Sequence, residues 1–332
     1  MQRFAYIGTG WWGMELAKNS LALKDMIQIA GCCTLIDKEA AAFQAQFGGK
    51  RFPRYEDALA DPEVDAVLLA TPHSLHWTQI IAAAKAKKNV FVEKPLALTV
   101  ETGQQAVKAV EDAHLTLGIG HNRRYSQVAR KMKEMVESGA VGKVLHAEAN
   151  YSSAGGMHYQ PGVWRAQREE CPGGGLAPMS LHVIDTMTWI LGPIARLSGI
   201  AKRQAITKVE LDDTAAALFE LESGATGSLG CVFATAMNAT LKLYGTKASI
   251  EARDNFKELL VTPVGATEPK IHWRYEIDDT VQQELKAFAE ACGNRTKFPV
   301  RPNEALHNVA VMQAIMESSA KGSAWVKLPP RG

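Results

Sequence analysis

The fold is decided by the stretch Arg3-Phe-Ala-Tyr-Ile-Gly8-Thr-Gly10-Trp-Trp-Gly13-Met-Glu-Leu-Ala17. It reads as a short apolar strand, a turn with glycines at Gly-x-Gly-x-x-Gly spacing, and the opening of a helix. Gly8 permits the tight turn, Gly10 leaves room for a pyrophosphate, and Gly13 lets the helix pack close to the strand. The free N–H groups and positive dipole end of the helix then face the anion. The pattern predicts a dinucleotide site; the alternative is a glycine turn with a purely structural role.

An acidic residue, Asp37, follows the next apolar run at 27–36. We expect Asp37 at the end of the second strand, where a carboxylate accepts hydrogens from the ribose hydroxyls and repels a 2′-phosphate. Lys38 stands next to it and would partly neutralise that repulsion. The sequence therefore favours NAD as the cofactor and leaves NADP open.

Composition limits the remaining classes of function. A chain of 332 residues suggests two domains, and its 22% charged and 46% hydrophobic residues are ordinary for a globular protein. The formal net charge is +2, from 37 basic and 35 acidic residues, which gives no basis for a nucleic-acid partner. No apolar run is long enough to cross a bilayer, and the first strand follows no charged leader. We therefore expect a cytoplasmic protein with a small-molecule substrate.

The five cysteines are odd in number and show no Cys-x-x-Cys metal spacing. Cys32 and Cys33 fall in the second predicted strand, so their side chains should point to opposite faces. Buried reduced thiols are the favoured interpretation for all five. Cys171 stands beside a glycine run, and a catalytic thiol there is the minor alternative.

Strands and helices alternate through the first third of the chain, which predicts an α/β fold with a doubly wound parallel sheet in a dinucleotide-binding domain, residues 1–120. The ligand crevice of such a sheet lies at the carboxyl ends of its strands, where Gly8, Asp37, Thr71 and Lys94 are expected. The elements expected here are strands at 27–36, 64–70, 89–93 and 115–119 and helices at 38–47, 75–86 and 100–113.

Residues 121–332 are expected to form an α+β domain on a largely antiparallel open sheet, serving substrate binding and oligomerisation. Helices are expected at 131–138, 179–191, 281–292 and 304–321. Strands are expected at 144–152, 215–221, 225–232, 239–244, 249–252 and 259–261.

A charged pair ends one strand in the run Val90-Phe-Val-Glu93-Lys94-Pro95. Pro95 fixes its own φ and pushes Lys94 toward an extended conformation, so the ammonium is aimed from the strand end into the crevice. There it would hydrogen-bond a substrate hydroxyl or carbonyl and favour developing negative charge. The alternative is a solvated turn.

A glycine run, Gly173-Gly-Gly175, precedes a helix that carries His182 and Asp185 at i and i+3. The glycines let the backbone pass close to a ligand, and the two side chains share one helix face. A histidine suits proton transfer coupled to alcohol oxidation. The alternatives are a core histidine and half of a metal site, for which no further ligands present themselves.

Three further segments carry candidate residues. The pair His73-x-x-His76 follows Thr71-Pro72, and we interpret His76 as a packing or hydrogen-bonding residue with no metal. An aromatic loop with Tyr159, Trp164 and Arg165 could clasp a polar ring or be an ordinary ordered loop. Arg124 either binds substrate or bridges the domains.

Taken together, these motifs resemble the Gfo/Idh/MocA oxidoreductase family over nearly the whole chain, with Glu-Lys-Pro as the most specific match. The matching segments are Gly8-Thr-Gly10-Trp-Trp-Gly13, Thr71-Pro72-His-Ser-Leu-His76, Glu93-Lys94-Pro95, Asn122-Arg-Arg124-Tyr125, Gly173-Gly-Gly175, His182-Val-Ile-Asp185 and Tyr244-Gly245-Thr246.

The resemblance implies NAD(P)-linked hydride transfer on a sugar, cyclitol or related cyclic alcohol, an aromatic dihydrodiol being one option, by a homodimer or homotetramer without metal. It implies that Lys94 orients the reacting oxygen and that His182 acts as acid/base. The expected cofactor-binding residues are Gly8, Thr9, Gly10, Trp11, Trp12, Gly13, Asp37, Lys38, Thr71, Pro72, His76, Glu93 and Lys94. The expected substrate-binding residues are Lys94, Arg124, Tyr159, Trp164, Arg165 and His182.

One position departs from the family's pattern. Many relatives have an aspartate four residues before the histidine, and here the residue is Pro178. Proline cannot pair with Lys94 or orient His182, so either Lys94 takes the main acid/base role or the chemistry differs. Asp185 either compensates or, one helical turn beyond His182, braces the helix or the domain interface. Two alternatives stay open: transient use of NAD for elimination or hydrolysis of a sugar bond, and a dinucleotide or sugar sensor without turnover.

Overall fold

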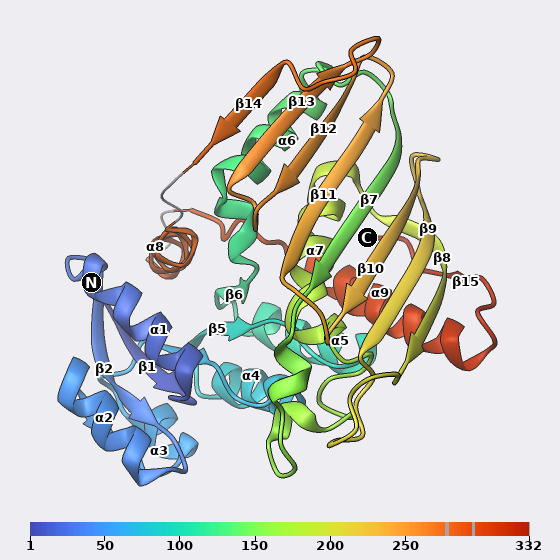
Figure 1. Ribbon diagram of the computed structural model, residues 1–332. Coiled ribbons are helices and arrows are strands. Elements are labelled where there is room, and N and C mark those ends of the chain that lie inside the picture. Colours follow the sequence, from blue (N-terminus) through green and yellow to red (C-terminus); the bar gives the residue numbers. More distant parts are fainter. Residues whose placement is uncertain (276–278, 294–295, 332) are drawn as a thin grey trace. The chain divides into compact units, whose positions relative to one another are not determined.

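The computed structural model describes residues 1–275, 279–293 and 296–331. The described chain divides into two compact units, each made of two segments. The first comprises Met1–Asn122 and Thr280–Leu306, and the second comprises Arg123–Asp279 and His307–Gly332. Figure 1 shows the elements of both. No described helix is both long and apolar enough to cross a membrane.

The first unit is built on a six-stranded sheet in the order β3-β2-β1-β4-β5-β6, with every described pairing parallel. Its strands are β1 (Gln2–Ile7), β2 (Ile27–Cys33), β3 (Lys50–Arg51), β4 (Ala66–Leu69), β5 (Asn89–Glu93) and β6 (Leu117–Gly120). Its helices are α1 (Trp11–Ser20), α2 (Asp37–Phe47), α3 (Tyr55–Ala60), α4 (His76–Lys85), α5 (Val100–Asp112) and α8 (Thr280–Cys292), with short 3₁₀ turns at Leu21–Leu23 and His73–Leu75. This is the predicted doubly wound α/β sheet. Strand β4 is apolar throughout and β5 is apolar from Val90 to Val92, as expected of parallel strands that helices cover on both faces.

Helix α8 belongs to this first unit, although we expected residues 121–332 to form the second domain. Its Phe288 is fully buried, with ring centroids 5.4 Å from Phe4 and 5.5 Å from Phe91. Gly118 on β6 leaves the space that Phe288 fills, since a Cβ there would lie 2.7 Å from its ring. An amphipathic helix packs where its apolar face is complemented, and here that surface is the parallel sheet.

The second unit is built on a nine-stranded sheet in the order β14-β13-β12-β11-β7-β10-β9-β8-β15. Neighbouring strands are antiparallel except for the parallel pair of β7 and β10. Its strands are β7 (Val144–Ser152), β8 (Ile194–Lys202), β9 (Thr214–Leu221), β10 (Thr226–Val232), β11 (Asn238–Gly245), β12 (Ala248–Arg253), β13 (Glu258–Pro263), β14 (Ile271–Arg274) and β15 (Val326–Lys327). The predicted antiparallel α+β architecture of this unit is therefore confirmed.

Helices α6, α7 and α9 lie against one face of this sheet and leave the other face open (Figure 1). They span α6 (Gln127–Glu137), α7 (Leu181–Leu191) and α9 (Pro302–Ala320), the boundary between the units falling inside α9. Shorter turns lie at Asn122–Tyr125, Gly155–His158 and Trp164–Ala166, and a π-helical turn at Leu176–Ser180 runs into α7.

All five cysteines are free thiols. Cys32, Cys33, Cys171 and Cys231 are buried, and Cys292 is half-buried. Burial raises the pKa of Cys33 and of Cys231 to about 11. Cys171 is fully enclosed in an apolar cluster with Leu211 and Phe233, which leaves it no access to a ligand. The interpretation of the cysteines as buried reduced thiols thus holds for four of them, with Cys292 less deeply placed.

Candidate active site

The glycine loop lies at the carboxyl edge of the parallel sheet, between β1 and α1. Gly8 has φ +85°, and a Cβ there would lie 2.6 Å from the Ala70 carbonyl oxygen. A Cβ on Gly13 would lie 2.0 Å from the Gly8 carbonyl oxygen. A Cβ on Gly10, in contrast, would meet no atom within 4 Å. Two of the glycines are therefore required by the protein itself, while the space at the third is available to a ligand.

The same loop carries buried polar atoms that the described residues do not satisfy. Thr9 Oγ1 and Trp12 Nε1 are both buried and have no hydrogen-bond partner among the described residues. Gly10 caps α1 without any side-chain hydrogen bond, so the first N–H groups of the helix are available to an anion. Buried polar groups are ordinarily paired. These residues fit the predicted dinucleotide, with its phosphates at the helix end.

Large apolar side chains are exposed on the loops beside this one. Trp11 is 69% exposed and stacks edge-on to Trp12, their ring centroids 5.0 Å apart. Leu35 and Ile36, on the loop after β2, are 97% and 54% exposed. Exposed apolar surface of this kind suits the flat face of a base.

Asp37 does not stand at the end of the second strand, where the sequence placed it. Strand β2 ends at Cys33, and Asp37 is the first residue of α2. Its carboxylate is exposed and forms an ion pair with Arg51 on β3. The sequence predicts a strand over the whole apolar run 27–36, but Leu35 and Ile36 lie in the loop after β2. Apolar periodicity cannot distinguish a strand end from an apolar loop. Lys38 follows as an exposed residue of α2.

The turns after β4 and β5 are joined by His76, which is fully buried. His76 Nδ1 lies 2.7 Å from the Pro95 carbonyl oxygen, and Nε2 lies 3.1 Å from the Thr71 carbonyl oxygen. Thr71 in turn donates a hydrogen bond from Oγ1 to Gln79, 2.6 Å away. His76 is therefore the hydrogen-bonding residue that the sequence suggested, and it holds the turn that carries Lys94 against the turn of Thr71 and Pro72.

Lys94 is half-buried and follows the buried Glu93 at the end of β5. The Lys94–Pro95 peptide bond is cis. A Cβ on Gly120, at the end of the adjacent strand β6, would lie 2.8 Å from Glu93 Oε2. His121, the residue after Gly120, is 2% exposed at the same edge. We had not selected His121, although its position directly after a parallel strand was a usable signal.

In the second unit, His182 lies in the first turn of α7 and is half-buried. Its ring centroid is 6.1 Å from that of Tyr151 on β7. Tyr151 accepts a hydrogen bond from Arg123 Nη2 at 3.1 Å. Tyr151 was not predicted as a site residue, because an aromatic residue in a strand is typical of an ordinary sheet position.

The glycine run before α7 packs closely on the protein. Gly174 has φ +63°, and a Cβ there would lie 1.7 Å from the Asp212 carbonyl oxygen. Gly175 leaves space for the Cys231 sulfur in the same way, at 2.6 Å. The chain then forms the π-helical turn, in which the Ser180 N–H donates to the Gly175 carbonyl at 3.1 Å. Pro178 occupies the middle of that turn.

Arg124 and Asp185 form a buried ion pair inside the second unit. Arg124 donates from Nε and Nη2 to the two carboxylate oxygens of Asp185, at 2.8 and 2.6 Å. Asn308 Nδ2 donates to the same carboxylate at 2.8 Å. The Arg124 side chain is 3% exposed and braces α7 inside the second unit. Its contact with substrate stays a prediction. The expectation that Asp185 braces the helix is consistent with this geometry.

The predicted aromatic loop packs partly on itself. Tyr159 stands edge-on to Phe233 at 5.5 Å, and burial raises its pKa to about 12. The Arg165 guanidinium lies over the Trp164 ring, 4.1 Å from its centroid. Both Trp164 and Arg165 are half-buried.

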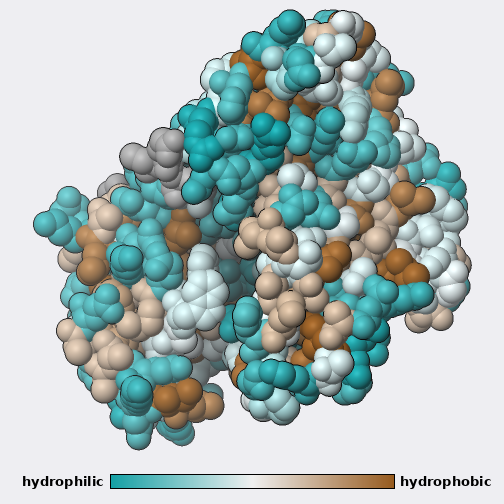
Figure 2. Space-filling model, viewed as in Figure 1, coloured by the Kyte–Doolittle hydropathy of each residue, from teal (hydrophilic) through white to brown (hydrophobic). Residues whose placement is uncertain are grey.

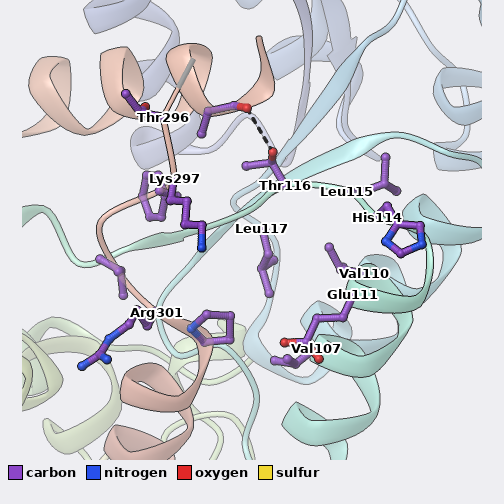
Figure 3. A pocket seen from close by; sticks show the side chains of 14 residues that line it. Val107, Val110, Glu111, His114, Leu115, Thr116, Leu117, Thr296, Lys297 and Arg301 are labelled. Atoms are coloured by element: carbon purple, nitrogen blue, oxygen red, sulfur yellow. Dashed lines mark hydrogen bonds between the residues drawn. The ribbon is translucent and has the colours of Figure 1, made fainter. Parts of the chain in front are cut away.

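One cavity of the first unit, of about 360 Å³, lies apart from these residues (Figure 3). Its walls come from the end of α5, the residues that begin β6, and the segment 296–302, with the side chains of Glu111, His114, Lys297 and Arg301 around it. None of the predicted site residues lines it. Because Leu117 begins β6, the cavity lies at the amino edge of the sheet, opposite the glycine loop. Among the described residues, no group of three or more His, Cys, Asp and Glu is arranged to hold a metal ion.

Comparison with known proteins gives matches over both units. A family model described as an oxidoreductase family with an NAD-binding Rossmann fold matches residues 2–121, and the GFO/IDH/MocA C-terminal domain model matches residues 129–251. The 1,5-anhydro-D-fructose reductase of Ensifer adhaerens is 26% identical over 292 residues, 86% of this chain and 87% of the relative. The myo-inositol 2-dehydrogenase of Thermotoga maritima is 29% identical over 269 residues, 78% of this chain and 77% of the relative. The solved structure of a levoglucosan dehydrogenase in complex with NADH has the same fold, with a TM-score of 0.90 at 22% identity over 99% of both chains.

Proposed function

The chain belongs to the GFO/IDH/MocA family of NAD-binding oxidoreductases, and we propose that it transfers a hydride between a nicotinamide cofactor and a carbon of a sugar, cyclitol or related cyclic alcohol. The observation that carries this proposal is the glycine loop, whose open space at Gly10 adjoins the unsatisfied polar atoms of Thr9 and Trp12. The substrate class is supported by relatives that are named for anhydrofructose, inositol, xylose and levoglucosan.

The residues of the glycine loop would bind the pyrophosphate through backbone N–H groups at the start of α1. The bound cofactor supplies the hydride acceptor for alcohol oxidation, or the donor for reduction. Lys94, held by the Glu93 and His76 turn, would hydrogen-bond the reacting oxygen through its ammonium group and stabilise negative charge developing there. His182 would take the hydroxyl proton during oxidation and return it during reduction.

The other candidate residues have positioning or binding roles in this proposal. Thr71, Pro72 and His76 form the wall that positions Lys94, and Tyr151 supports the ring of His182. Arg124 becomes a residue that positions α7 through Asp185. Tyr159, Trp164 and Arg165 stay substrate-binding predictions for the loop that carries them, and Asp37 and Lys38 stay cofactor-binding predictions.

Turnover of purified protein tests the proposal, with NAD and NADP separately against sugars, cyclitols, sugar acids and aromatic dihydrodiols, followed by absorbance of reduced nicotinamide. Lys94→Ala should lower kcat about 10²–10³-fold and His182→Ala about 10²–10⁴-fold, because an electrostatic donor and a proton-transfer group are removed. Lys108→Ala, at an exposed residue of α5 paired with Asp112, is the matched control. Activity that survives Lys94→Ala would remove it from the mechanism. Tight cofactor binding without net reduction across the panel would favour transient oxidation or sensing.

We also propose that the chain is a cytoplasmic homodimer or homotetramer that pairs through the open face of the nine-stranded sheet. That face carries exposed Leu218 on β9 and Ile200 on β8 among polar neighbours such as Glu148, and Figure 2 shows hydrophobic residues scattered among polar ones over these strands. A second copy would cover them. Light scattering of Leu218→Lys should give a smaller particle than the unaltered chain; an unchanged mass would exclude this face.

A further inference from the structure

The residue directly after β2, which we call the β2 corner, has a hydroxyl side chain. A carboxylate is the side chain expected at this position in a site that selects NAD. The first residue beyond β2 is Thr34, which donates a hydrogen bond from Oγ1 to Glu39 at 2.8 Å. This corner is tied directly to the glycine loop, because the Gly8 N–H donates to the Cys33 carbonyl at 2.8 Å. In a dinucleotide-binding sheet, the residue at this corner faces the adenosine ribose, and a carboxylate there rejects a 2′-phosphate. The Thr34 hydroxyl is uncharged and does not itself reject a 2′-phosphate; the carboxylate nearest to it is that of Glu39 on α2, to which it donates its hydrogen bond.

A guanidinium stands beside the same corner. Arg51 lies on β3, in register with Cys32 on β2, and the Phe52 N–H donates to the Cys32 carbonyl at 2.8 Å. The positive charge of Arg51 acts on both thiols at the end of β2, lowering the pKa of Cys32 and Cys33 against the larger effect of burial. Its side chain is 41% exposed, so it is accessible to a ligand.

The acid that the sequence assigned to the ribose is engaged by this arginine. Asp37, 86% exposed at the start of α2, forms its ion pair with Arg51 across the loop 34–36. An exposed pair of this kind contributes little to stability and is readily exchanged for another anion. A phosphate offers a guanidinium two parallel hydrogen bonds, which a point charge such as Lys38 does not match.

From these contacts we propose that Arg51 receives the 2′-phosphate of NADP(H), with Thr34 as its hydroxyl neighbour, so that this chain binds NADP(H) at least as tightly as NAD(H). The inference rests on the dinucleotide site proposed above and reverses the preference for NAD that the sequence suggested. On binding, the Arg51–Asp37 pair opens and Arg51 turns to the phosphate, with no covalent step.

Direct binding to the full-length protein tests this without any substrate. The dissociation constants of NADPH and NADH are measured by calorimetry or by quenching of tryptophan fluorescence. In the unaltered chain we expect NADPH to bind as tightly as NADH or more tightly. Arg51→Ala should weaken NADPH at least tenfold and leave NADH within threefold. The matched control is Lys50→Ala, whose side chain is one residue away on the same strand and paired with Asp61 at 2.8 Å; it should leave the ratio unchanged.

A second pair of ligands, which differ by the 2′-phosphate, measures the contribution of that phosphate to binding. 2′,5′-ADP should compete with NADPH better than 5′-AMP does, and the difference should vanish in Arg51→Ala. Thr34→Asp should restore the carboxylate corner and weaken NADPH relative to NADH. NADH binding that is tighter than NADPH binding in the unaltered chain, or a ratio unmoved by Arg51→Ala, overturns the inference while leaving the dinucleotide site intact. Binding of neither nucleotide overturns both.

Discussion

Substitution of the loop glycines by alanine should affect stability and dinucleotide binding differently at each position. In Gly13→Ala the new Cβ would meet the Gly8 carbonyl oxygen at 2.0 Å, so the strand and helix must separate. We expect a loss of about 1–3 kcal/mol in the free energy of unfolding together with loss of dinucleotide binding. Gly10→Ala has open space, so its stability should change by less than about 0.5 kcal/mol while NADH or NADPH binding weakens.

Urea unfolding and nucleotide titration of the two glycine variants separate these effects. Unchanged nucleotide binding in Gly10→Ala, in a folded protein, would mean that the phosphates do not approach this part of the loop.

The Arg124–Asp185 pair makes a second contrast at single residues. Arg124→Leu removes the cation that neutralises the buried Asp185 carboxylate, which keeps its hydrogen bond from Asn308, and we expect a loss of about 3–5 kcal/mol in the free energy of unfolding. Adding Asp185→Asn removes the buried charge, so the double variant should recover part of the loss. The interaction energy follows from a double-mutant cycle in urea. If Arg124→Leu instead raises KM with stability unchanged, the arginine contacts substrate as the sequence first suggested.

At the scale of elements, α9 is joined to β8 by a neutral histidine. His307 is 4% exposed, and its Nε2 accepts a hydrogen bond from the Ile194 N–H at 3.0 Å. Burial, assisted by the positive charge of Arg331, lowers the pKa of His307 to about 4 from its ordinary value of 6.5. The unfolded chain therefore binds the extra proton at a higher pH than the folded protein does.

The stabilising contribution of His307 is fully present above about pH 6.5 and is lost as the pH falls toward 4. The pKa difference corresponds to about 3 kcal/mol. His307→Gln keeps a hydrogen-bond acceptor and removes the titration, so its stability should fall less between pH 7 and pH 4.5 than that of the unaltered chain. Parallel slopes of the two proteins in urea unfolding across this pH range would contradict the assignment.

The elements that the sequence predicted well are those whose apolar pattern has no competing interpretation. Strands β5 and β7 begin and end where we expected. In β5 the reason is plain, because the run Val90-Phe-Val92 of β-branched and aromatic residues lies between polar and charged residues. Strand β8 was missed, since a register shift between Ile194 and Arg196 breaks its period of two. The prediction that Asp37 ends the second strand was wrong, because the apolar residues Leu35 and Ile36 extend the strand pattern but lie in an exposed loop.

The same limit applies to the candidate site. Motifs fixed by backbone geometry, such as Gly8 and Gly13, can be found from spacing alone. Partners that come from distant parts of the chain cannot, and so Arg51 beside Asp37 and Asn308 beside Asp185 emerge only from the structure.

At the scale of the whole molecule, each unit is assembled from two separated segments of the chain. Phe288→Ala, in the second segment of the first unit, would leave a cavity against Phe4 and Phe91. We expect a loss of about 3–5 kcal/mol and a fall in amide hydrogen-exchange protection over β1, β4 and β5. Lys286→Ala, exposed on the same helix, is the control. A fall in protection confined to residues 123–279 would contradict the assignment of α8 to the first unit.

The position of α8 late in the sequence also affects how the first unit folds while the protein is being synthesised on the ribosome. When residue 122 has been added, all six parallel strands exist, yet the helix that covers Phe4 and Phe91 has not been translated. At about 5–20 residues per second, the nascent chain waits roughly ten to forty seconds before residue 306 is added. During that interval an apolar sheet surface is exposed to chaperones, while the segment 123–279 emerges and can begin to fold. The nucleotide-binding unit, whose first segment is translated before the second unit, is thus among the last parts of this polypeptide to complete its folding.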